Sequence, residues 1–232
     1  MHRAASALAA ALLLPACTRG GTQAATPRGA GSGSVADAGQ LQAVADALTA
    51  GRDATFKVVY AAASASSPGG PGTVTVERKP PKSLLSTPDG AVISDGTSTW
   101  FCSAPPSPVG HPACLAVRGT NPLASLATVF SAQTVAGVLQ NARANMGARV
   151  GARTSGYAVA VSHETFAGQE STCAKVTGPD PSASGKYCAT SGGILAYVGS
   201  PAGQTFAMAA YSASVPDSDF ALPAGANPQQ LP

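Results

Sequence analysis

The sequence predicts an α+β domain in which helices cover one face of a single large antiparallel sheet. Three observations lead to this fold class. A helical pattern opens the domain, alternating runs separated by turn signals follow it, and a second helical region divides the strands into two groups. Strands that follow one another closely pair as hairpins, and helices grouped apart from them must cover a sheet face.

The domain begins with a predicted helix over residues 35–52. Gly51 is a typical stop signal near its end. The apolar residues of this segment recur at helical spacing, which gives the helix one buried face: Leu41, Val44, Ala45 and Leu48.

About five strand candidates follow this helix. The first two read TFKVVY and TVTVERK, alternate in character and flank a Pro- and Gly-rich turn, which predicts a hairpin. Three shorter candidates lie around Leu84, around residues 92–93 and over residues 99–102. The pairs Asp89–Gly90 and Asp95–Gly96 between them are hairpin turn signals.

The second helical region reads NPLASLATVFSAQTVAGVLQNARANMG. Asn121 can cap a helix, Pro122 suits the first helical position, and Ser131 can cap a second helix. The pattern predicts either one kinked helix or two consecutive ones. Its apolar residues form two stripes, the first of Leu123, Leu126 and Phe130 and the second of Val135, Val138, Leu139, Ala142 and Met146.

About four further strands close the domain. They are expected in YAVAVSHETF, STCAKVTG, KYCATSGGILAYVG and QTFAMAAYSASV, with a turn at residues 191–193. The ending PDSDFALPAG predicts an irregular tail that brings Phe220 and Leu222 back to the core.

The amino end predicts export and anchoring. The apolar run over residues 4–14 follows Arg3 and is shorter than the about 20 residues that cross a bilayer, as in a secretory signal. Leu14-Pro15-Ala16-Cys17 resembles the bacterial lipobox, which implies cleavage after residue 16, a diacylglycerol on the Cys17 sulfur and further acylation at the new amino end. The alternative is an ordinary signal peptide cleaved near Ala16.

The chain therefore divides into a lipoprotein signal peptide over residues 1–16, a flexible tether over residues 17–34 and one domain over residues 35–232. The tether is rich in Gly, Thr, Ser and Ala and has no apolar pattern to bury. We expect the protein at the cell membrane, lipid-anchored on the extracytoplasmic side.

Four cysteines remain in the domain, an even number that predicts disulfides in an exported chain. Three connectivities are possible. We favour nearest-neighbour pairing, Cys102 with Cys114 and Cys173 with Cys188, because each pair flanks a loop rich in Pro, Gly or Ser. Zinc binding is the alternative, although the spacings differ from those of zinc knuckles and His111 is the only nearby histidine.

Composition and motifs argue against a nucleic-acid-binding protein and against an enzyme. Charged residues make up 11% of the chain, the formal net charge is +3, and no basic run occurs. His163 and Glu164 are adjacent, but neighbours on a strand face opposite sides. The sequence has no G-x-S-x-G, and only His111 and His163 could serve a Ser-His-Asp triad. We expect no catalytic site, no metal and no cofactor.

The order of the motifs resembles the LolA-like superfamily, which includes lipoprotein carriers, RseB-like periplasmic regulators and anchored actinobacterial lipoproteins of the LppX and LprG type. The resemblance covers residues 35–224. It rests on F-x-V-x-Y, V-x-V-x-R-x-P-P-x-S, the hairpin ISDGTSTWFC and a closing Phe-x-Leu-Pro over residues 220–223. It implies a strongly curved antiparallel sheet, an incomplete barrel, with helices covering the concave face and an apolar cavity between them.

The resemblance also implies which residues line that cavity. The alternative is that the same residues simply pack a solid core. The candidates are Phe56, Val58, Tyr60, Val74, Val76, Trp100, Leu126, Phe130, Val138 and Tyr157.

These expectations lead to a function. We expect an anchored, exported lipoprotein that binds a lipid or other apolar ligand in the cavity between sheet and helices. The alternative is an envelope sensor or interaction lipoprotein of the RseB-like kind, which has a protein partner and no transported ligand. A purely structural surface lipoprotein is a third possibility.

Overall fold

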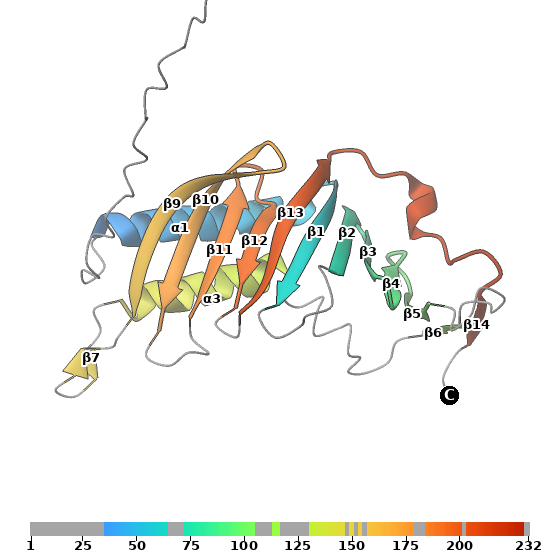
Figure 1. The fold of residues 1–232 in the computed structure, drawn as a ribbon, viewed down its shortest axis with the longest axis horizontal. Coiled ribbons are helices and arrows are strands. Elements are labelled where there is room, and N and C mark those ends of the chain that lie inside the picture. The colour runs from blue at the N-terminus through green and yellow to red at the C-terminus, as the bar shows by residue number, and fades with distance from the viewer. Residues whose placement is uncertain are drawn as a thin grey trace, which may run out of the picture.

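The computed structural model describes most of the chain from residue 35 onward. Twelve strands form one open sheet, and helices α1 (Val35–Ala50) and α3 (Ala132–Ala144) pack against each other on one face of it (Figure 1). We call this face inner and the opposite face outer. The described residues are 35–64, 72–104, 113–116, 130–146, 149–150, 153–154, 157–178, 184–200 and 203–229.

The sheet has the order β14-β6-β5-β4-β3-β2-β1-β13-β12-β11-β10-β9. Its first group is β1 (Phe56–Ser64), β2 (Gly72–Lys79), β3 (Lys82–Thr87), β4 (Gly90–Ser94), β5 (Thr99–Ser103) and β6 (Ala113–Ala116). Its second group is β9 (Ala158–Phe166), β10 (Gln169–Thr177), β11 (Gly185–Thr190), β12 (Leu195–Gly199) and β13 (Gln204–Ser212). The remaining strands are β14 (Asn227–Gln229) and the separate pair β7 (Arg149–Val150) and β8 (Arg153–Thr154).

The α+β class is confirmed, with one difference in strand direction. All neighbouring strands pair antiparallel except β14, which lies parallel to β6 at one edge and makes the sheet mixed. The chain reaches this edge along the tail after β13, whose 3₁₀-helix η3 (Asp217–Phe220) contacts β3 (Figure 1). The predicted irregular tail therefore ends in a strand, and β6 was not predicted at all.

The β1–β2 hairpin forms as the alternation predicts. Val58 stands opposite Val76, and Tyr60 stands opposite Val74, so that these four side chains share the inner face. Val58, Tyr60 and Val74 are buried in the main core, and Val76 packs against it.

Helix α1 ends where the sequence predicts, at a close contact between two glycine backbones. Gly51 follows the helix in the short turn η1 (Gly51–Asp53), and Gly193 lies in the β11–β12 turn with φ at 72°. A Cβ on Gly193 would collide with the carbonyl oxygen of Ala47 and the backbone of Gly51. Only glycine therefore allows the end of α1 to lie this close to the sheet.

Ser131 caps the start of helix α3, as the sequence predicts. Its hydroxyl accepts a hydrogen bond from the Thr134 amide at 3.3 Å. The buried arc of α3 extends to Ala136 on one side. Val138 lies on the other side and is 37% exposed. The first predicted stripe, apart from Phe130, lies outside the described residues.

A second, smaller core lies on the outer face. It contains Ile93 and the Cys102–Cys114 pair, and Trp100 and Leu222 pack against it. The tail beyond β13 therefore covers part of the outer face and brings Leu222 to a core, as predicted. Phe220 is also buried.

Both predicted cysteine pairs are bonded. Cys102 is joined to Cys114 across β5 and β6, and Cys173 is joined to Cys188 across β10 and β11. Because the sulfurs are bonded to each other, no thiolate at these positions can bind zinc, although the Glu164 carboxylate lies within 4.8 Å of the Cys173 and Cys188 sulfurs.

Among the described helices, none has the length and apolar character to cross a membrane.

Candidate functional site

The strongest candidate site is a hollow between the inner face of β1–β4 and the start of α3. We call it the sheet–helix pocket; its volume is about 310 Å³. Three of the predicted cavity residues, Phe56, Val76 and Phe130, line it. The remaining lining residues are Glu77, Arg78, Pro80, Pro81, Lys82, Ser83, Leu84, Leu85, Val92, Ser131, Ala132 and Gln133.

The floor of the pocket is apolar and follows from the strand register. Val76 stands opposite Leu85, and Leu85 stands opposite Val92, so that the three side chains form one row across β2, β3 and β4. Leu85 is buried and belongs to the main core. The floor of the pocket is therefore continuous with the core of the domain.

The wall on the helix side is Phe130, just before α3. Its ring lies 4.7 Å from that of Tyr60 and 5.0 Å from that of Phe206, within the range of favourable aromatic pairs. The buried Tyr60 hydroxyl donates a hydrogen bond to the Leu195 carbonyl at 2.6 Å, and burial raises the pKa of Tyr60. These contacts hold Phe130 in place over the sheet.

The opening of the pocket is polar. Arg78 is two residues beyond Val76 on β2, so it faces the same side of the sheet, and it stands between Phe56 and Ser83 in the register. Ser131 and Gln133 contribute from the first turn of α3. The site thus joins an apolar floor to a polar rim with one cationic side chain on the inner face.

A network of ion pairs lies beneath this rim on the outer face. Lys57 Nζ is 2.7 Å from Glu77 Oε1 and 3.1 Å from Asp219 Oδ2. Asp217 binds the two lysines that flank the Pro80–Pro81 turn, Lys79 at 3.0 Å and Lys82 at 2.9 Å. The tail after β13 is therefore tied to β1, β2 and β3 next to the pocket.

Glu77 is the buried member of this network. Its side chain is 3% exposed, and its Oε2 has no hydrogen-bond partner among the described residues. Burial raises the pKa of Glu77, and Lys57 opposes this only in part. Lys57 lowers the pKa of Asp219, and Lys82 and Lys79 lower that of Asp217.

These shifts predict how stability depends on pH. Because its folded-state pKa is raised, Glu77 adds stability as the pH falls from neutral toward the ordinary Glu value of about 4.3. Asp217 and Asp219, whose pKa values are lowered, contribute stability above about pH 3.9 and lose it as the pH falls through their lowered values. We expect Glu77→Gln to remove the rise in stability on mild acidification.

Urea unfolding at a series of pH values measures this effect. The matched control is Glu170→Gln, which changes an exposed glutamate on β10 and should retain the wild-type pH profile. A Glu77→Gln protein that gains as much stability on acidification as the wild type would contradict this account of the network.

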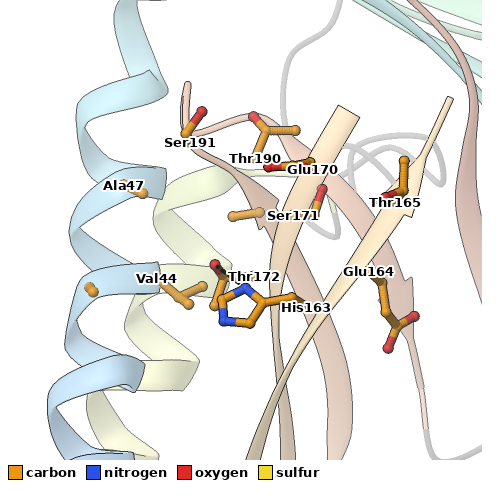
Figure 2. A pocket seen from close by; sticks show the side chains of 12 residues that line it. Val44, Ala47, His163, Glu164, Thr165, Glu170, Ser171, Thr172, Thr190 and Ser191 are labelled. Carbon is orange, nitrogen blue, oxygen red and sulfur yellow. Dashed lines mark hydrogen bonds between the residues drawn. The ribbon is translucent and has the colours of Figure 1, made fainter. Parts of the chain in front are cut away.

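A second hollow of about 390 Å³ lies between α1 and the ends of β9, β10 and β11. Figure 2 shows His163 and Thr172 on the side facing Val44 and Ala47 of α1. His163 Nδ1 lies 3.4 Å from the Thr172 hydroxyl. The hollow has hydroxyl groups at its rim and lacks the continuous apolar floor of the sheet–helix pocket.

His163 and Glu164, which are adjacent on β9, face opposite sides of the sheet, as the sequence predicts. His163 lies on the side of α1, whereas Glu164 points away from it (Figure 2). The Glu164 carboxylate binds Lys186 Nζ at 2.6 Å, which lowers the pKa of Glu164. Both residues line the second hollow, but their side chains point to opposite faces of β9.

The other predicted cavity residues that the structure describes do not line the sheet–helix pocket. Val58, Tyr60 and Val74 are buried core residues, and Tyr157 packs against the same core. Val138 is exposed on α3. Leu126 lies outside the described residues, as does Cys17.

Trp100 is the clearest correction, because it faces the wrong side of the sheet. Phe101, not Trp100, stands in the row of Val76, Leu85 and Val92. Trp100 and Cys102 share the outer face with the second core. The prediction also missed Leu85 and Val92, whose place on the floor depends on register, and Arg78, which appeared only as part of a motif.

Comparisons with known proteins concern the fold. No family model matches this sequence, and no curated protein matches it. Among solved structures, the crystal structure of MucB in complex with MucA(peri) matches with a TM-score of 0.41 at 11% identity, over 82% of this chain and 60% of that one. A LolA superfamily protein from Nitrosomonas europaea matches with a TM-score of 0.29 at 13% identity, over 78% of this chain and 97% of that one.

Proposed function

We propose that this protein is an extracytoplasmic binding lipoprotein, anchored through Cys17, whose sheet–helix pocket holds the acyl chain of a lipid or another apolar ligand. The observation that carries the proposal is the apolar floor of Val76, Leu85 and Val92 in a pocket that Phe130 also lines. A volume of about 310 Å³ is at the lower end of the range of roughly 300–1,000 Å³ for small-molecule sites. It suits one acyl chain better than several.

The proposed location agrees with the cysteine chemistry. Two disulfides fit an oxidising compartment outside the cytoplasm. A lipid on Cys17 and a flexible tether over residues 17–34 would keep the domain near the membrane, where acyl chains are available.

The test of this proposal places a larger side chain in the pocket. Val92 is half-buried on the pocket floor, so Val92→Trp is expected to weaken binding of a fluorescent fatty acid by roughly tenfold or more, because an indole ring occupies the space of the chain. The measurement is a fluorescence titration together with the melting temperature.

The matched control is Ala160→Trp, which adds the same bulk at an exposed position on β9. It should bind the fatty acid as the wild type does. Equal affinity for the fatty acid in the Val92→Trp protein and the wild type would place the ligand elsewhere and end the proposal for this pocket.

A second candidate function, the sensor or interaction lipoprotein, is favoured by the edge strand β9. This strand ends the sheet, and its register with β10 has no bulge from Ala158 to Phe166. The segment AVAVSHETF contains no proline and no lysine. Edges without such protection can accept a strand from a partner protein. A protein that takes up no amphiphile in the titration above would favour this function.

A further inference from the structure

Among the described residues, the cationic side chains around the sheet–helix pocket do not all have an acidic partner. On the outer side, Lys57 is paired with Glu77 and Asp219, and Lys79 and Lys82 share Asp217. Within the described part of the chain, no hydrogen bond or ion pair joins the Arg78 side chain to another residue. The Arg78 guanidinium at the rim of the pocket is therefore without a charged partner among the described residues.

Arg78 is placed to meet a ligand that occupies the floor. It lies on the inner face of β2 two residues from Val76, it lines the pocket, and its side chain is half-buried. Next to it, β1 contributes Phe56, so the cation stands at the border between apolar floor and solvent. A guanidinium presents a planar fork of donors that matches a carboxylate or a phosphate.

The start of α3 adds to the same electrostatic environment. Ser131, Ala132 and Gln133 line the pocket, and the first turn of this helix contains no acidic residue that would offset its positive end. No acidic side chain of the described residues stands on the inner face of the pocket, because Glu77 is directed to Lys57 on the outer side. Among the described residues, the charges that face the rim on the inner side therefore favour an anionic group.

We propose that the ligand of this pocket is a single-chain amphiphile with an anionic head group, a carboxylate or a phosphate, which Arg78 binds at the rim. The chain lies on Val76, Leu85 and Val92 while the head group remains at the border with solvent. This inference rests on the proposed function of the pocket and adds the chemistry of the head group. It makes Arg78 a determinant of specificity, since it distinguishes an anionic amphiphile from a neutral one of the same length.

The test compares three amphiphiles with the same chain, dodecanoate, dodecyl phosphate and dodecanol, by isothermal titration calorimetry at monomeric concentrations on the full-length protein. A hydrogen bond to a charged group predicts that the wild type binds at least one anion roughly 10- to 100-fold more tightly than dodecanol. Arg78→Gln should abolish this preference, so that the three amphiphiles bind with similar affinities. Arg78→Lys should keep part of it, because lysine retains the charge without the planar fork.

The matched control is Arg143→Gln, which removes an exposed arginine from α3 outside the pocket and should leave all three affinities unchanged. A preference for dodecanoate over dodecyl phosphate, or the reverse, identifies which anion the rim accepts. Equal binding of dodecanol and both anions by the wild type would overturn the role of Arg78 while the proposed function stands. Failure of the wild type to bind any of the three would overturn the proposed function itself.

Discussion

Replacing Cys17 by serine is expected to move nearly all of the protein from the membrane fraction to the soluble fraction. A serine hydroxyl cannot take the place of the sulfur that would receive the diacylglycerol. Two or three acyl chains hold a protein stably on a bilayer, whereas one chain gives only marginal binding. The predicted tether, residues 17–34, has no apolar pattern that could retain the domain at the membrane.

Fractionation of cells followed by detection of the protein measures this change. Pro15→Ala is the control, because it alters the residues before the cysteine and keeps Cys17 itself; this variant should remain with the membrane. If the Cys17→Ser protein also remains with the membrane, a lipid on Cys17 is not what holds the protein there. If the wild type is itself found in the soluble fraction, the ordinary signal peptide cleaved near Ala16 is the better interpretation.

Removal of the Cys173–Cys188 disulfide by a double change to alanine is expected to destabilise the domain by about 3 kcal/mol, since the crosslink closes a loop of 15 residues. This corresponds to a change of roughly a hundredfold in the unfolding equilibrium. Both cysteines are completely buried in the main core, so loss of packing adds to the loss of the crosslink.

Urea unfolding without reductant measures the difference. The matched comparison is the double alanine variant of Cys102 and Cys114, whose sequence separation is 12 and which lies in the smaller outer core. The two disulfides close loops of similar length, so they should contribute similar loop-closure entropy. Any further difference between the unfolding free energies of the two variants therefore reports local packing. A loss below about 1 kcal/mol for Cys173–Cys188 would show that the crosslink contributes little to the stability of the core.

Local signals predicted the elements that local interactions determine. The β1–β2 hairpin follows from two alternating runs and one turn, and the end of α1 follows from Gly51. Strand β14 could not be found in this way, because three residues that include Pro228 carry no periodic signal and pair in parallel with a strand more than a hundred residues earlier. The same holds for the four residues of β6.

The site was predictable only in part because its floor depends on register. Residues 100–102 read Trp, Phe and Cys, three apolar residues in succession, so alternation cannot say which of them faces inward. The pairing of Cys102 with Cys114 on the outer face places Phe101 inside and Trp100 outside. Helical periodicity has a similar limit in α3. The spacing places Leu139 on the buried face but does not say whether that face extends toward Ala136 or toward Val138, and the structure buries Ala136 and exposes Val138.

Native mass spectrometry of the domain over residues 35–232, purified from its own host, decides whether the sheet–helix pocket holds an amphiphile. We expect a mass above that of the polypeptide, a single extractable amphiphile with an anionic head group, and loss of this species in the Val92→Trp protein. A bare polypeptide mass with both disulfides intact, together with no uptake of added dodecanoate, would contradict the claim and direct attention to a protein partner at β9.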